Sequence, residues 1–327
     1  MASRTDKPKK TSLDILVPCY NEEINIPHLF ESFDRFVITQ GPKWEIYLII
    51  IDNGSSDNTR TLAESFITQR KNCRLVGLSR NFGKEASLSA GMFESTSDFV
   101  VPIDADLQDP IEVISDMLEQ WKKLGSDVVL GRRKQSIAQN PLRRLSSVTF
   151  SKIFSSLADV DVPVDVGEFR LMTRKVVDAF CALPESQRYV RGLFAWMGFK
   201  TSIIEFERKS RNNGRSKFTF LKLLDLGING IVSFSTKPLR ILIATGFGIS
   251  LTTFALGFWV LIRKILGSYS IPGYTSLAFL VSFLGGMQLF TLGLVGEYVG
   301  KAMLEAKRRP LYFIDHRFVS SSEGDRK

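Results

Sequence analysis

The chain has 327 residues, and its 43 Lys and Arg against 34 Asp and Glu give a formal net charge of +9. Its two histidines lie far apart and its three cysteines form no Cys-x-x-Cys pair, which excludes histidine-rich metal sites and argues against a zinc ribbon or a disulfide framework. A positive excess of this size favours an anionic partner: nucleic acid, a membrane surface or phosphorylated substrates.

Residues 1–12 are polar and basic, and they predict a flexible tail without a signal peptide. After this tail, two hydrophobic patterns alternate along the chain. Short apolar runs predict strands over Leu13–Val17, Ile46–Ile51, Leu75–Leu78, Phe99–Ile103 and Val128–Leu130. Helical spacing predicts helices over Ile26–Val37 and near 58–69, 84–94 and 111–124. The alternation predicts an α/β fold with a doubly wound, mostly parallel sheet over residues 13–215, whose ligands bind at the carboxyl ends of the strands.

Two longer apolar runs follow, over Leu239–Ile262 and Leu277–Val295. About 20 apolar residues suffice to cross a bilayer as a helix, and the alternative is a helix buried in a globular core. More basic charge flanks the pair than lies in its loop. The pattern therefore predicts an integral membrane protein with a two-helix hairpin over 237–300, the α/β domain and both termini being cytoplasmic. Residues 216–236 are either an interfacial juxtamembrane region or an ordinary helix packed on the α/β domain.

The C-terminal tail, 301–327, and the glycines of the hairpin are relevant to the oligomeric state of the protein. Glycines allow close helix packing, either within one chain or between chains. The apolar and aromatic residues of 309–314 can add a strand to a neighbouring subunit. A homo-oligomer is therefore a hypothesis from the sequence.

A pair of carboxylates follows the fourth predicted strand. Asp104 and Asp106 stand two residues apart, and they repel each other unless a cation lies between them. Hard oxygen ligands suit Mg²⁺ or Mn²⁺, which in turn holds substrate phosphates, and Gln108 adds a possible further ligand. The alternative is a solvated turn, with Asp109 as the N-cap of the next helix.

Polar residues also follow the first two strands, at Tyr20-Asn21-Glu22 and at Asp52-Asn53-Gly54-Ser55. In a doubly wound sheet these two strand ends can be neighbours. An acidic residue such as Asp52 at a strand end can accept hydrogen bonds from a base or ribose. The residues of the second motif are equally suited to a tight turn, and the two interpretations are compatible.

Four motifs in this order resemble those of the family 2 glycosyltransferases of GT-A (Rossmann-like) fold. They are Pro18-x-Tyr20-Asn21-Glu22, Asp52-Asn53-Gly54-Ser55-x-Asp57, Arg80-Asn81-Phe82-Gly83-Lys84 and Asp104-Ala105-Asp106-Leu107-Gln108-Asp109-Pro110. The chain is most similar to the polyprenyl-phosphate branch, which includes bactoprenol glucosyltransferases and dolichol-phosphate mannose synthases. The resemblance covers nearly the whole chain.

The resemblance implies the roles of particular residues. The residues implied to bind the nucleotide sugar are Pro18, Tyr20, Asn21, Glu22, Asp52, Asn53, Arg80, Lys84, Asp104, Arg132, Arg143 and Ser147. The divalent metal, Mg²⁺ or Mn²⁺, is implied to be held by Asp104, Asp106 and Gln108. For Arg80 and Lys84, an exposed basic face is the alternative.

Two further segments match family patterns. In Asp165-Val166-Gly167-Glu168-Phe169-Arg170-Leu171 the family places its proposed base, but Glu168 stands where an aspartate is commoner. Asp165 is favoured as the base, and Asp165, Glu168 and the metal ligand Asp106 form the predicted catalytic set. The acceptor phosphate is implied to meet a basic loop before the hairpin, at Arg208, Arg215, Ser216 and Lys217. Attraction of this loop to anionic head groups is the simpler alternative.

The predicted function is transfer of a hexose, with inversion, from a nucleoside diphosphate sugar to a polyprenyl phosphate at the cytoplasmic membrane face. UDP-glucose and undecaprenyl phosphate are favoured by the bactoprenol resemblance alone. One alternative is a processive polysaccharide synthase, although no Gln-x-x-Arg-Trp motif is present. Another is a non-catalytic protein that binds or escorts lipid-linked sugars. Nucleic acid is not an expected partner, because the basic residues carry no recognition motif.

Overall fold

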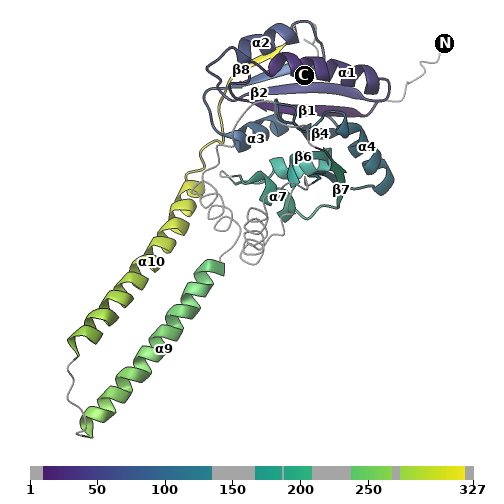
Figure 1. Cartoon of the computed structure of the whole chain (residues 1–327). Helices are drawn as coiled ribbons and strands as arrows, with labels where there is room; N and C mark the ends of the chain where they lie inside the picture. Colours follow the sequence, from purple (N-terminus) through teal and green to yellow (C-terminus); the bar gives the residue numbers. More distant parts are fainter. Residues whose placement is uncertain (1–9, 135–165, 186–187, 208–236, 267–272, 321–327) are drawn as a thin grey trace, which may run out of the picture. The chain divides into compact units, whose positions relative to one another are not determined.

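The computed structural model describes residues 10–134, 166–185, 188–207, 237–266 and 273–320 (Figure 1). Its strands are β1 Ser12–Cys19, β2 Glu45–Asp52, β3 Cys73–Leu78, β4 Phe99–Pro102, β5 Val128–Arg133, β6 Val166–Thr173, β7 Thr201–Phe206 and β8 Ile314–Val319. Its helices are α1 Ile26–Gln40, α2 Thr59–Ile67, α3 Lys84–Glu94, α4 Val113–Leu124, α6 Arg174–Cys181, α7 Val190–Trp196, α9 Lys237–Ile265 and α10 Tyr274–Ala306. The five strands and four helices predicted for the first 133 residues are confirmed, with boundaries that differ by at most three residues.

The strands form one sheet in the order β7-β5-β6-β4-β1-β2-β3-β8. The pairs β1–β2, β1–β4, β2–β3 and β5–β7 are parallel, which confirms the predicted α/β fold with a mostly parallel sheet. Strand β6 lies antiparallel between β4 and β5. The sequence pattern missed β6, because Gly167, Glu168 and Arg170 interrupt its apolar residues. These same interruptions bring polar side chains to the middle of the sheet.

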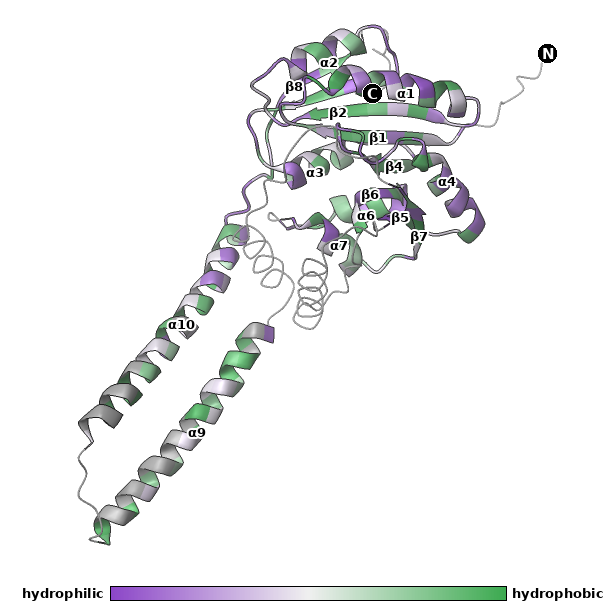
Figure 2. Ribbon diagram, in the orientation of Figure 1, coloured by the Kyte–Doolittle hydropathy of each residue, from purple (hydrophilic) through white to green (hydrophobic). Residues whose placement is uncertain are grey.

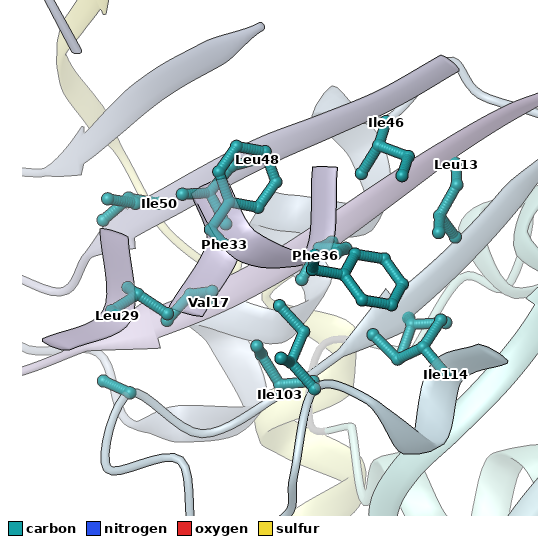
Figure 3. Close-up of a cluster of buried hydrophobic side chains, with 14 of the residues drawn as sticks. Leu13, Val17, Leu29, Phe33, Phe36, Ile46, Leu48, Ile50, Ile103 and Ile114 are labelled. Carbon is teal, nitrogen blue, oxygen red and sulfur yellow. The ribbon is translucent and has the colours of Figure 1, made fainter. Parts of the chain in front are cut away.

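Helices cover both faces of the sheet. On one face, α1, α2 and α4 close over a core cluster that includes Leu13, Val17, Phe33 and Leu48 (Figure 3). The buried residues of α1 recur at helical spacing, as the sequence predicts. Each such large side chain contributes roughly 1.5–3 kcal/mol when it leaves water. The hydrophobic colour of β2 in Figure 2 reflects its burial between the two helical layers.

On the opposite face α3 packs closely against the sheet. A Cβ atom added at Gly91 of α3 would lie 2.9 Å from Cδ1 of Ile51 and 3.1 Å from Cδ1 of Leu16. A larger residue at this position would require the ends of the Ile51 and Leu16 side chains to shift. The glycine thus fixes how closely α3, and with it Lys84 at its N-terminal end, approaches the carboxyl ends of the strands.

The chain divides into two compact units. The sheet and its covering helices belong to the first, and α9 and α10, with 29 and 33 residues, belong to the second. Over the residues that the structure describes, neither of these helices nor any other is both long and apolar enough to cross a bilayer. The prediction of an integral membrane protein with two spans and cytoplasmic termini is therefore wrong. That prediction considered only the absence of charge in the two runs. Small and polar residues such as Thr245, Gly246 and Gly248 lower the mean hydropathy of the helix.

The end of the chain returns to the first unit. Strand β8 pairs antiparallel with β3 of its own chain, with Val76 opposite Arg317. The segment predicted to add a strand to a neighbouring subunit, 309–314, overlaps β8 only at Ile314, and this pairing stays a hypothesis. The predicted juxtamembrane region, 216–236, lies outside the described residues.

Candidate active site

The turns that follow β1 and β2 are tied together by hydrogen bonds. The amide nitrogen of Asn21 donates to Oγ of Ser55 at 3.0 Å, and that of Ser56 donates to Oδ1 of Asn21 at 2.9 Å. The amide nitrogen of Glu22 donates to Oγ1 of Thr59 at 2.8 Å. Asn21 has a φ of 55°, which asparagine tolerates better than most residues. The two polar motifs are therefore neighbours, as the sequence predicts.

Asp52 ends β2 and is fully buried. Its Oδ1 accepts a hydrogen bond from the amide of Ser55 at 3.0 Å, and its Oδ2 accepts one from Nε of Arg60 at 2.7 Å. The turn chemistry predicted for this motif is thus present. Arg60, in the first turn of α2, was not singled out from the sequence, because only the fold brings it to the end of β2.

Asn53, the next residue, orders the loop between β3 and α3. Its Nδ2 donates to Oδ1 of Asn81 at 3.0 Å, and its Oδ1 accepts from the amide of Phe82 at 2.9 Å. Gly54 has a φ of +69°, and a Cβ atom there would lie 2.5 Å from the carbonyl carbon of Arg80. Asn53 and Gly54 therefore join the second motif to the 79–83 loop, while Asn21 joins the first motif to the second.

Lys84 connects two acidic residues at the centre of the candidate site. Its Nζ forms ion pairs with Oδ1 of Asp104 and, at 2.6 Å, with Oε2 of Glu168. Burial lowers the pKa of Lys84, but the attraction of the two carboxylates outweighs it and raises the pKa above its ordinary value. The other oxygen of Glu168 lies 3.5 Å from Nη2 of Arg191. Both oxygens of Glu168 are thus in contact with a cation.

The predicted metal ligands follow β4 in a strained turn. Oδ1 of Asp106 accepts a hydrogen bond from the amide of Gln108 at 3.2 Å. Leu107 between them has a φ of 49°, which is unusual for a branched side chain. The side chain of Gln108 is buried. Among the described residues, no group of three or more His, Cys, Asp or Glu side chains is placed to hold a metal ion.

Negative charge accumulates at these strand ends. Burial raises the pKa of Glu22, and the nearby carboxylates of Asp106 and Asp104 raise it further, while a hydrogen bond from Asn25 lowers it. Burial also raises the pKa of the Cys19 thiol, and the nearby carboxylates add to this effect. The site therefore favours bound positive charge beyond that of Lys84.

Asp109 and Arg133 form a second ion pair beside the acidic turn. The guanidinium binds both carboxylate oxygens, at 3.2 and 2.9 Å, and Asp109 is buried. Asp109 also lines a cavity of about 10 Å³ with Asp104 and Glu168, room for one water molecule. Arg132 lies 4.0 Å from Glu205 on β7, and its contact with the nucleotide sugar stays a prediction.

Glu85 is a residue of the site that the sequence analysis missed, although it directly follows Lys84. Its Oε2 accepts a hydrogen bond from the amide of Val190 at 3.2 Å, at the start of α7. Burial and the nearby Glu168 raise the pKa of Glu85 to about 7. Through this contact Glu85 supports the short helix that carries Arg191.

The remaining predicted residues divide into two groups. Pro18 is paired with Ile51 within the sheet, while Tyr20 and Arg80 are exposed beside the polar turns. The others lie outside the described residues, and their roles stay predictions: Asp165, Arg143, Ser147, Arg208, Arg215, Ser216 and Lys217.

The described site therefore combines the polar turns after β1 and β2 with a charged row, Asp104–Lys84–Glu168–Arg191. Carboxylates at one end of the row attract cations, and arginine at the other end attracts anions.

Comparison with known proteins identifies the family of this chain. The model of glycosyl transferase family 2 matches residues 14–180. An uncharacterized glycosyltransferase of Synechocystis is 38% identical, over 92% of this chain and 94% of its own. A bactoprenol glucosyl transferase of Shigella phage SfX is 37% identical over 93% and 99% of the two chains. A prophage bactoprenol glucosyl transferase homolog of Escherichia coli is 36% identical over 92% and 98%.

Solved structures also align with the chain. A mannosyltransferase from Pyrobaculum calidifontis in complex with GDP-Man and Mn²⁺ is 14% identical with a TM-score of 0.46, covering 92% of this chain and 87% of its own. Glucosyl-3-phosphoglycerate synthase from Mycobacterium tuberculosis, in complex with Mn²⁺, UDP and phosphoglyceric acid, is 18% identical with a TM-score of 0.48, covering 68% and 76%.

Proposed function

Because the chain belongs to glycosyl transferase family 2, we propose that it transfers a hexose from a nucleoside diphosphate sugar to a polyprenyl phosphate. An oxygen of the acceptor phosphate attacks the anomeric carbon. The bond from that carbon to the diphosphate breaks as the new bond forms, and the nucleoside diphosphate leaves with the electron pair. Attack from the opposite face inverts the configuration. The charged row from Asp104 to Arg191 is the observation that carries this proposal: a carboxylate stands at one end and an arginine at the other, and we assign the first end to the donor and the second to the acceptor.

The donor is proposed to lie against the turns after β1 and β2. Asn21 and Asn53 hold the backbone of these turns and of the 79–83 loop in place. Asp52 acts by orienting its turn, since both of its oxygens already accept hydrogen bonds within the protein. UDP-glucose is the proposed donor because the related bactoprenol proteins carry glucosyl transferase in their names.

A divalent cation fits the donor end of the row. Asp104 and Asp106 supply two carboxylates, and burial raises the pKa of Glu22, with a further increase from the charges of Asp106 and Asp104. Mg²⁺ and Mn²⁺ sites of this kind commonly use one or two protein carboxylates and complete their shell with substrate phosphates and water. Asp104 and Asp106 would hold the ion, with Gln108 as the further predicted ligand. When bound, it neutralises the charge of the leaving diphosphate.

Glu168 is proposed to position charges rather than to remove a proton. Lys84 and Arg191 contact its two oxygens, so a proton could be accepted only after one cation had moved. Asp165 remains the proposed base. A phosphate monoester has its second pKa near ~6 and is largely ionised at neutral pH, so the acceptor needs little help from a base.

The test is a transfer assay with labelled sugar nucleotides, Mn²⁺ and undecaprenyl phosphate in detergent solution. A single sugar on the lipid is the expected product, and UDP-glucose is the expected best donor. A polymer would favour a processive synthase instead. Binding of the lipid-linked sugar without any turnover would favour an escort protein.

A further inference from the structure

A pocket of about 230 Å³ lies beyond Arg191, at the acceptor end of the charged row. Strands β5, β6 and β7 form one wall of the pocket, and α7 forms another. Two of its lining residues are arginines, Arg170 on β6 and Arg191 on α7. Most of the other lining residues are apolar, among them Leu130, Phe194 and Phe199. The pocket thus joins positive charge to an apolar surface.

Arg170 is buried, with only 4% of its surface exposed. Its Nη2 donates to the carbonyl oxygen of Gly167 at 2.9 Å, and its guanidinium lies 4.7 Å from the centre of the Phe194 ring. Its Nε has no hydrogen-bond partner, and among the described residues no carboxylate lies within ion-pair distance. Burial lowers its pKa to about 10, so it remains charged at neutral pH. The charges of Glu168 and Glu85 act on Arg170 from beyond ion-pair distance and offset only part of the cost of its burial, because burial still lowers its pKa. An anion bound in direct contact would offset more of that cost.

Arg191 links this pocket to the proposed reaction. Its guanidinium lies 3.5 Å from Oε1 of Glu168, which Lys84 connects to Asp104. A row of three ion pairs therefore connects the pocket to Asp104, one of the carboxylates proposed to hold the cation of the donor diphosphate. Inversion requires the donor leaving group and the acceptor on opposite sides of the anomeric carbon.

We propose that this pocket binds the phosphate monoester of the acceptor, with Arg170 and Arg191 as its cationic contacts and the apolar wall against the first prenyl unit. The assignment rests on the proposed function. The volume is below the ~300 Å³ at which pockets for drug-sized ligands begin, so it suits a phosphate with a short apolar segment and not a whole sugar nucleotide. Guanidinium groups bind phosphate through two parallel hydrogen bonds.

The test measures kinetics and direct binding with the full chain. Arg191→Gln and Arg170→Met are expected to raise KM for farnesyl phosphate by about tenfold or more, the loss that follows removal of a charge-assisted hydrogen bond. KM for UDP-glucose should change less than twofold. Lys175→Gln is the matched control, because Lys175 lies 5.2 Å from the ring of Phe199, does not line the pocket and is exposed. It should leave both KM values unchanged.

Calorimetry without donor makes the result independent of turnover. Farnesyl phosphate should bind, inorganic phosphate should compete with it, and farnesol should not compete. If Arg170→Met does not fold, Arg191→Gln and the calorimetry test the assignment instead. The Arg191 side chain is 42% exposed, so its replacement should not prevent folding. If farnesyl phosphate binds in an arginine-dependent manner but no sugar is transferred, the pocket assignment stands and the proposed function is refuted. Transfer with an unchanged KM for the acceptor, or a raised KM for UDP-glucose instead, would overturn the pocket assignment.

Discussion

Arg60 and Asp52 form an ion pair of 2.7 Å at the carboxyl end of β2, and the same guanidinium reaches Oδ2 of Asp315 on β8 at 3.2 Å. Asp52 is fully buried, whereas 39% of the Asp315 side chain is exposed. One arginine therefore connects a turn of the proposed donor site to the last strand of the sheet. The C-terminal segment is thereby part of the framework that holds this turn.

Removal of the Arg60 charge should destabilise the protein far more than removal of the Asp315 charge. Arg60→Gln leaves the buried Asp52 carboxylate without its cation and should lower the free energy of unfolding by about 3 kcal/mol. Asp315→Asn breaks only a partly exposed pair and should cost less than about 1 kcal/mol. Urea unfolding at pH 7 measures both. Equal losses would mean that Arg60 does not compensate Asp52.

Replacement of Lys84 should impair catalysis more than folding. Lys84→Met leaves the carboxylates of Asp104 and Glu168 close together without their shared cation. We expect kcat/KM to fall by about 100-fold, the scale of losing one electrostatic contact in an active site. Lys84→Arg should restore part of the activity, and Lys123→Met, at the exposed end of α4, should retain all of it. Full activity in Lys84→Met would exclude this role.

Asp106 is proposed to hold the metal ion and Asp165 to act as the base, and replacing them should reduce sugar transfer to different extents. Asp106→Asn should raise the Mn²⁺ concentration needed for half-maximal transfer and lower the rate strongly. Asp165→Asn should retain more activity, because an ionised acceptor phosphate needs little proton removal. Chelation of divalent ions with EDTA should abolish transfer, and added Mn²⁺ should restore it. Comparable losses of labelled product in the two variants would contradict this assignment.

Glu85 should make stability depend on pH. Its pKa is about 7 in the folded protein against 4.5 in the unfolded chain, so the folded state binds more protons between these values. The contribution to stability is fully present below pH 4.5 and is lost as the pH rises through about 7, a change of about 3 kcal/mol. Glu85→Gln should remove this slope from urea unfolding measured at pH 5, 6, 7 and 8. A slope equal to that of the wild type would refute it.

Gly54 should tolerate substitution less well than Gly125, although both have positive φ. Gly125→Ala adds a methyl group where no atom lies within 4 Å, so only backbone strain of about 1 kcal/mol is expected. Gly54→Ala also meets the backbone of Arg80 at 2.5 Å and should cost about 3 kcal/mol in all. Chemical denaturation of the two variants gives the comparison. A similar loss in both would show that the 79–83 loop moves freely away.

The hydrophobic patterns and four short motifs were sufficient to predict much of this protein. Parallel strands buried on both faces appear as apolar runs, and helices packed on one side repeat every 3.6 residues. This is why β1 to β5 and α1 to α4 were found. The family was identified as well, because four short motifs resemble those of the family in residue type and in their order along the chain. Strands β6 to β8 were missed, since polar residues such as Glu168 and Arg170 break their pattern.

Contacts between distant segments were decided by the tertiary structure alone. Nothing in the local sequence relates Arg60 to Asp52 and Asp315, or Lys84 to Glu168, because each partner is chosen by how the elements pack. The same holds for Arg170, a residue of a known motif whose burial beside a pocket no pattern reports. Membrane spans were predicted from uncharged runs and are not found among the described helices. The sequence thus determined, through local periodicity, that β1 to β5 and α1 to α4 form. Through residue type it determined which charged and polar side chains the strand ends carry. The pairing of charges across the sheet depended on three-dimensional proximity, which local patterns do not encode.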